Sequence, residues 1–142
     1  MKISELLDLF TEIPKPIDYI DKDHCEECND HFNELSQYTS KSLPYSIIEN
    51  PGWDPTCFLT PLGFRYYITG LIRLSNGHHE WIETLISRLT GYQRPGLNTN
   101  DLHIVSLVML EWLKDSTIGT EDKILIKNYL SLKPIDSELI SQ

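Results

Sequence analysis

The sequence predicts an all-α fold, a single compact domain of about six to eight helices. Apolar residues recur at the three- and four-residue spacing of helices, and no stretch has the strict alternation typical of strands. Proline, glycine and asparagine divide the chain into segments of helix length. With 142 residues, 40% of them hydrophobic, the chain can bury one sizeable core. We therefore expect one helical domain over residues 1–142.

Two helices are expected near the N-terminus. Apolar residues within residues 3–10 form one helical face, and this helix must end before Pro14, because proline lacks an amide donor and restricts the residue before it. A second helix is expected from Asp23 to about Gln37. The Asp23 carboxylate is suited to cap the free amides of the first turn, and Glu26, three residues on, completes a capping box.

The middle of the chain is predicted to hold a long connection and a central helix. The prolines and the glycine of the connection leave room for one short helical turn at residues 45–48. Thr60-Pro61 has the pattern of an N-cap followed by proline at the first helical position, and Asn76-Gly77 is typical of a helix end. The helix between them is apolar around much of its circumference, so we expect it at the centre of the fold.

Three further helices are expected in the C-terminal half. Helical spacing of apolar residues predicts one helix over residues 79–90, closed by Gly91, and another over residues 100–115. The second of these is apolar nearly all round, which is typical of a buried helix. Thr120 begins a last amphipathic helix that ends before Pro134.

The charge of the chain limits the partners that it can bind. It has 12 lysines and arginines and 21 aspartates and glutamates, which gives a net charge of -9. Such a surface repels phosphate backbones and anionic lipid headgroups, which argues against direct binding of nucleic acid or membranes. A basic protein, or a cation, is the partner that this field attracts.

The chain has the features of a cytoplasmic protein. The N-terminus has acids within its apolar pattern and no small-residue cleavage site, so we expect no signal peptide. The longest apolar stretch, Ile104 to Leu113, is too short to span a bilayer. Three cysteines, an odd number, are typical of reduced thiols.

The segment from His24 to His31 contains the residue types that bind zinc. A CxxC pair, Cys25 and Cys28, lies between the two histidines. At about 100° per residue both cysteines share an apolar helix face with Phe32, which favours packing over ligation. A structural zinc site needs four ligands, and no second pair with suitable spacing follows. We expect no metal and no cofactor, and a zinc-binding or redox-sensing module is the alternative.

The sequence contains no motif for catalysis. It has no GxSxG, P-loop, GxGxxG or HExxH pattern. The other histidines, His78, His79 and His103, fit structural positions at a helix start or among core residues. We therefore expect no catalytic residue and no enzyme activity.

Acidic residues concentrate near the N-terminus. Residues 1–34 contain ten acids and three lysines, so most of the net charge lies there. Four of the acids follow at i, i+4, i+7 and i+11 on the second expected helix, within about 60° of one another. We interpret this face, with the Asp-Tyr-Ile-Asp stretch before it, as a docking surface for a basic partner. The expected partner-binding residues are Asp18, Tyr19, Asp21, Asp23, Glu26, Glu27, Asp30 and Glu34.

Two segments resemble a family of small bacterial proteins, largely of unknown function. Residues 23–31 read DHCEECNDH, and residues 58–67 read FLTPLGFRYY. The family is marked by an HCEEC motif and a later helix start of the form LTPxGFRYYLP, and the resemblance covers about residues 20–115. After the tyrosines this chain has Ile68-Thr69-Gly70 where the family tends to have Leu-Pro. We therefore expect this helix to run straight where its relatives kink.

The resemblance implies a helical immunity protein of a bacterial toxin system, such as contact-dependent growth inhibition. Such a protein lies in the cytoplasm and neutralises a cognate toxin domain, commonly a basic nuclease or ribonuclease, by covering its active site. An acidic helix face is suited to occupy the positive cleft of a nuclease. We expect a 1:1 complex with the toxin domain and a monomer outside it. An adaptor for a different basic protein is a further alternative.

Overall fold

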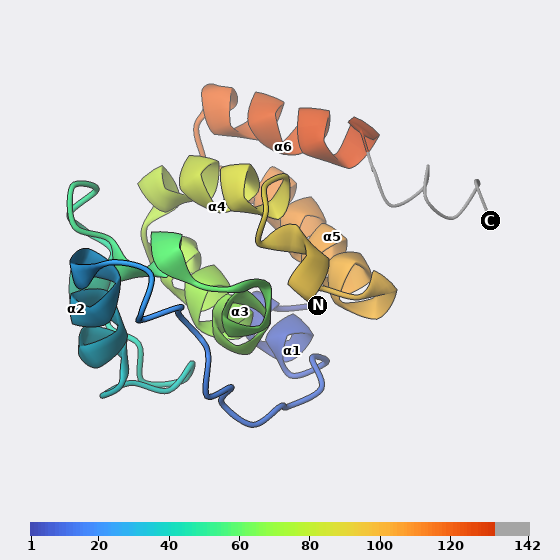
Figure 1. The fold of residues 1–142 in the computed structure, drawn as a ribbon. Helices are drawn as coiled ribbons and strands as arrows, with labels where there is room; N and C mark the ends of the chain where they lie inside the picture. Colours follow the sequence, from blue (N-terminus) through green and yellow to red (C-terminus); the bar gives the residue numbers. More distant parts are fainter. Residues whose placement is uncertain (133–142) are drawn as a thin grey trace.

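A computed structural model gives the fold and describes residues 1–132. Over these residues six α-helices and four short 3₁₀ helices follow one another without a strand, which confirms the predicted all-α fold (Figure 1). An isolated antiparallel bridge joins Ile20 to Leu59. The α-helices are α1 (Ile3–Leu7), α2 (Glu26–Leu35), α3 (Pro61–Gly77), α4 (Ile82–Leu89), α5 (Thr99–Lys114) and α6 (Thr120–Leu132); the 3₁₀ helices are η1 (Tyr45–Ile47), η2 (Pro55–Phe58), η3 (His79–Trp81) and η4 (Arg94–Gly96).

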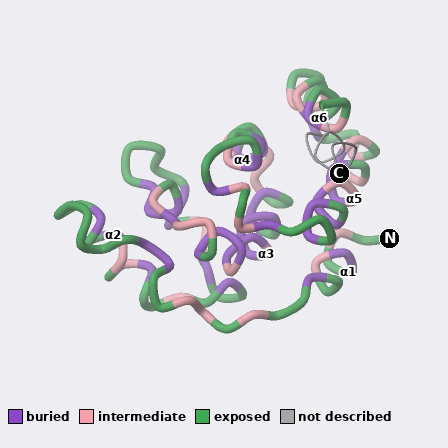
Figure 2. Tube along the Cα trace, turned by 45° about the vertical axis from the view of Figure 1, so that its right-hand side comes forward, coloured by how far each residue is buried: buried purple, intermediate pink, exposed green. Residues whose placement is uncertain are grey.

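The central element is α3, as the sequence predicted. Phe64, Tyr67, Ile68 and Leu71 of this helix are completely buried. It contacts α1 and α4, while α6 lies across α4 and α5 (Figure 1). The buried side chains belong to one apolar cluster, to which every α-helix contributes (Figure 2). In contrast, α2 lies to one side of the bundle, with its outer side exposed.

Local capping explains where the helices begin. The Thr60 hydroxyl accepts a hydrogen bond from the Gly63 amide at 3.0 Å, with Pro61 at the first helical position, as predicted. At α5 the Asn98 side chain accepts from the Asp101 amide at 2.8 Å, and the Asp101 carboxylate accepts from the Asn98 amide at 3.0 Å. The sequence placed this helix one residue later.

Four other predictions can be compared with the structure. The helix predicted over residues 79–90 is divided into η3 and α4, and the short turn predicted at residues 45–48 is η1. The chain continues through Thr69 and Gly70 without a break in α3. Pro134, expected to limit the last helix, lies outside the described residues. None of the helices within residues 1–132 combines the length and apolar composition needed to cross a membrane.

Candidate partner-binding surface

The segment in front of α2 holds this helix against the bundle. The Tyr19 ring stacks on the Phe32 ring, 4.4 Å between centroids, and the Tyr19 hydroxyl donates to the Phe32 carbonyl oxygen at 2.6 Å. The Thr60 amide donates to the Tyr19 carbonyl oxygen at 3.0 Å, next to the bridge between Ile20 and Leu59. These contacts join the two ends of the segment, residues 20–59, that contains α2. We call the junction the clasp; it consists of Tyr19, Ile20, Leu59 and Thr60.

The beginning of α2 differs from the prediction. Cys25, not Asp23, is the N-cap residue, and its sulfur accepts a hydrogen bond from the Cys28 amide at 3.1 Å. Asp23 lies in a turn that is closed by the hydrogen bond from the His24 amide to the Asp21 carbonyl oxygen at 3.2 Å. The predicted capping box at Asp23 is therefore wrong, because this turn keeps its carboxylate away from the free amides. The helix also ends at Leu35, earlier than predicted.

Six carboxylates are exposed on α2 and on the segment before it. Lys22 is the one basic residue among them in the sequence, and its Nζ lies over the Phe32 ring, 5.1 Å from the centroid. Within residues 1–132 no lysine or arginine forms an ion pair with any of the six. We call this set the acidic surface; it consists of Asp18, Asp21, Asp23, Glu26, Glu27 and Asp30.

Two of the predicted partner-binding residues have other surroundings. Tyr19 is 4% exposed and belongs to the apolar core, so it is not part of the outer surface. Glu34 is partly buried and accepts a hydrogen bond from the Trp53 indole nitrogen at 3.0 Å. The spacing of the acids at i, i+4, i+7 and i+11 identified the exposed side of the helix. It gives no information about Trp53, which comes from a loop outside the helix.

Among the described residues, the histidines and cysteines of residues 24–31 form no group that could hold a metal ion. His24 is exposed, whereas His31 is 1% exposed and packs against the rings of Trp53 and Phe58, with centroids 4.2 and 4.7 Å away. Within residues 1–132 no three His, Cys, Asp or Glu side chains are grouped so that they could hold a metal ion. Hydrogen bonding with the Cys25 side chain, followed by burial, raises the pKa of the Cys28 thiol to about 11.

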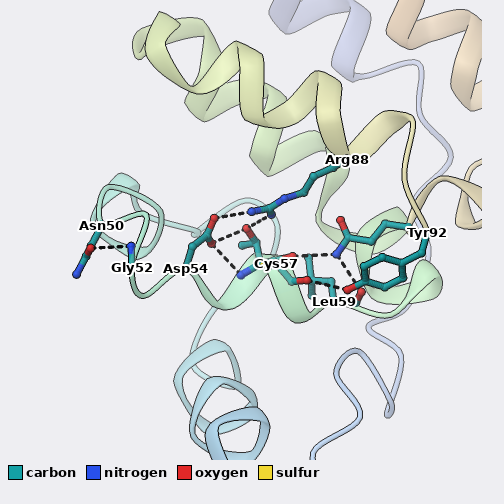
Figure 3. Close-up of polar contacts among 9 residues, drawn as sticks. Asn50, Gly52, Asp54, Cys57, Leu59, Arg88 and Tyr92 are labelled. Carbon is teal, nitrogen blue, oxygen red and sulfur yellow. Dashed lines mark hydrogen bonds and ion pairs between the residues drawn. The ribbon is translucent and has the colours of Figure 1, made fainter.

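A polar network fixes the η2 segment behind α2 (Figure 3). The Asp54 carboxylate accepts from the Thr56 amide at 2.9 Å. The Arg88 guanidinium donates to Asp54 at 2.6 Å and also to the Thr56 hydroxyl. The Gln93 side chain donates to the carbonyl oxygens of Thr56 and Leu59 at 3.0 and 2.9 Å. Sequence analysis did not single out these residues, because they come from separate parts of the chain and share no motif.

A cavity of about 440 Å³ lies beside α2 and shares Glu27 with the acidic surface. Its other carboxylates are Glu49, Asp54 and Glu80, which come from the η1–η2 connection and from η3. We call it the acidic cavity. Sequence reasoning missed Glu49 and Glu80, because only the folded chain brings them next to α2. The sequence around them gives no charge signal, because residues 41–90 contain four acids and four lysines or arginines.

A larger cleft of about 740 Å³ lies between α1, the segment after it and α3. Its basic side chains already bind groups of the chain itself. Arg65 donates to the Asp101 carboxylate at 2.9 Å, and Lys15 donates to the carbonyl oxygens of Leu35 and Tyr38 at 3.0 Å. We assign these cations to attaching the α1–α2 connection and the end of α2 to the bundle.

Comparison with known proteins found no matching family model, no matching curated protein and no matching solved structure.

Proposed function

We propose that this chain is an immunity protein that binds a cognate bacterial toxin domain, a nuclease or ribonuclease, through the acidic surface. The toxin is neutralised by steric and electrostatic occlusion of its basic active site, without chemistry by this chain. The observation that supports the proposal is a set of six exposed carboxylates with no lysine or arginine partner within residues 1–132. Their negative charge is available to a partner.

Paired and unpaired carboxylates differ in how strongly they attract a basic partner. A carboxylate that already has a basic neighbour gains little from an incoming cation, whereas an unpaired one contributes its full field. A nuclease cleft is positive because it must attract phosphates. An acidic surface on a firmly attached helix therefore enters such a cleft in a fixed orientation, as a nucleic-acid mimic. The clasp and the buried face of α2 supply that attachment.

Charge reversal on the acidic surface tests the proposal. The test variant carries Glu26→Lys, Glu27→Lys and Asp30→Lys, which leaves Glu34 and its bond to Trp53 intact. Calorimetric titration with the C-terminal domain of a toxin encoded beside the gene measures the affinity, and growth during toxin expression measures protection. We expect the affinity to fall at least about a hundredfold and protection to be lost, because three attractive charge pairs become repulsive.

The control variant changes the net charge by the same amount as the test variant, at positions outside the acidic surface. It carries Glu12→Lys, Glu83→Lys and Glu121→Lys, all at exposed positions outside the acidic surface. It is expected to bind and protect nearly as the natural chain does. Full protection by the test variant, with its helical circular dichroism unchanged, would contradict the proposal. Binding to a basic protein that is not a toxin, with no protection, would favour the adaptor alternative.

A further inference from the structure

The acidic cavity has more negative charge than its own basic residue can neutralise. Four carboxylates and one guanidinium line it. The guanidinium of Arg88 is held by Asp54 at 2.6 Å and by the Thr56 hydroxyl, and lies over the Trp81 ring, 5.2 Å from the centroid. Asp54 and Arg88 thus satisfy each other, and the other three carboxylates remain.

The three remaining carboxylates have no lysine or arginine partner within residues 1–132. Glu27 has His31 as its neighbour, at 3.8 Å from Nε2. Glu80 accepts from the Tyr45 hydroxyl at 2.8 Å and lies 3.6 Å from His78. Its own backbone N–H and the Tyr45 hydroxyl hold the pKa of Glu80 below its ordinary value, so the group is ionised at neutral pH. Glu49 completes the group.

His31 gives the cavity a buried polar group without a partner. The side chain is 1% exposed, and within the described residues its Nδ1 has no hydrogen-bond partner. The Trp53 and Phe58 rings pack against its ring, and His31 is one of the residues that line the cavity. A buried polar atom without a partner is unfavourable, and a ligand that supplies the missing hydrogen bond removes this cost.

The walls are aromatic as well as acidic. Tyr45, Phe58 and Trp81 line the cavity together with the three carboxylates. Aromatic faces attract cations, and a planar guanidinium combines stacking with several directed N–H donors, which a lysine ammonium does not. Arg88 already shows this arrangement within the cavity, between the Trp81 ring and the Asp54 carboxylate.

From these contacts we propose that the acidic cavity binds the guanidinium of an arginine side chain of the basic protein partner. The partner's arginine stacks on the aromatic wall and pairs with Glu49 and Glu80, while Glu27 continues the negative surface outward along α2. The identity of the partner as a toxin domain rests on the proposed function; the affinity of the cavity for guanidinium does not.

Titration of the whole isotope-labelled chain with a blocked arginine, N-acetyl-arginine amide, tests the proposal by NMR. The expected result is saturable binding, with shifts concentrated at His31, Glu80 and the indole signals of Trp53 and Trp81. The matched probe is N-acetyl-citrulline amide, which has the same shape without the charge and is expected not to bind. Equal shifts with citrulline, equal affinity for N-acetyl-lysine amide, or shifts away from the cavity would each overturn the proposal.

A pair of variants links the binding to the carboxylates. Glu49→Gln combined with Glu80→Gln keeps the side-chain shape but removes two charges, and the affinity for blocked arginine is expected to fall at least tenfold. The control, Glu83→Gln combined with Glu121→Gln, removes two exposed charges outside the cavity and is expected to leave the affinity unchanged. An equal affinity of the two double variants would overturn the proposal.

The two proposals fail in distinguishable ways. Arginine binding by an isolated chain whose charge-reversed variant still protects against the toxin would reject toxin binding through the acidic surface and keep the cavity. Toxin binding that depends on the acidic surface, with no binding of blocked arginine, would reject the cavity and keep the proposed function.

Discussion

Cys28 shows how the immediate surroundings of one side chain decide its chemistry. A CxxC pair between histidines is a common zinc or redox motif, yet here the first cysteine caps a helix and the second is buried against the core. The thiolate is the reactive form of cysteine, and the raised pKa of Cys28 disfavours it. The pattern of residue types in the sequence could not distinguish a cap from a ligand.

The raised pKa predicts a reactivity difference between the cysteines. In the folded chain at about pH 8.5, alkylation of Cys28 by iodoacetamide is expected to be at least tenfold slower than that of the exposed Cys57, because less of it is thiolate and it is buried. Peptide mass spectrometry over time measures both rates. In urea the two rates are expected to become similar; similar rates in the folded chain would contradict the prediction.

The raised pKa of Cys28 also makes the free energy of unfolding depend on pH. Because the pKa of Cys28 in the folded chain, about 11, lies above its ordinary value of 9.0, folding favours the protonated thiol. Its contribution to the free energy of unfolding is complete below about pH 9 and is lost as the pH rises towards 11.

At the scale of the element, the start of α3 can be predicted from the sequence. The helix also depends on a close packing contact that the sequence does not reveal. Thr60 and Pro61 mark its beginning, and local chemistry is enough to predict them. Gly70, in its interior, allows the backbone at Ser40 to come so close that an added Cβ would lie 2.3 Å from the Ser40 carbonyl oxygen. No local pattern reveals this contact, because Ser40 belongs to a distant loop.

Replacement of two glycines of α3 measures this close approach. Gly70→Ala is expected to lower the free energy of unfolding by about 1–3 kcal/mol, since the Ser40 backbone must move. Gly77→Ala is the control: a Cβ there meets nothing within 4 Å, and alanine favours the helix by up to about 1 kcal/mol. Urea unfolding followed by circular dichroism compares them. Equal stability of both variants would show that the loop at Ser40 yields freely.

The helices differ in how well their boundaries could be predicted from the sequence. The helices α3 and α5, which have clear caps and apolar periodicity, were predicted to within a residue or two, and α6 begins at Thr120 as predicted. The start of α2 was not, because the turn at Asp21 to His24 depends on the segment's attachment to the bundle. The exposed side of α2 followed from its periodicity, whereas the acidic cavity did not, since its carboxylates come from separate elements.

At the scale of the whole molecule, the net charge of -9 is unevenly distributed. The acidic surface and the acidic cavity share Glu27, so they form one continuous negative region around α2. The cations of the large cleft, in contrast, bind the chain's own carboxylates and carbonyl groups. A basic partner approaching from solution is therefore drawn towards the α2 side.

This asymmetry predicts how salt acts on binding of the proposed toxin partner. Raising NaCl from about 0.05 to about 0.5 M is expected to lower the association rate constant by about an order of magnitude or more and to change the dissociation rate constant much less. Surface plasmon resonance with immobilised toxin domain measures both constants. The charge-reversed α2 variant provides the comparison; an association rate that does not respond to salt would show that the acidic field does not guide the encounter.

The clasp has a consequence for how this chain can change. The segment that contains α2, η1 and η2 begins at Ile20 and ends at Leu59, and these two residues pair in the isolated bridge. A replacement for this segment would have to keep the contact of Ser40 with Gly70 and the hydrogen bond from the Tyr67 hydroxyl to the Leu35 carbonyl oxygen, because α3 packs against both. Residues 20–59 therefore supply one part of the proposed recognition region, and η3, which carries Glu80 and Trp81 of the acidic cavity, supplies another, so a new specificity would need changes in both.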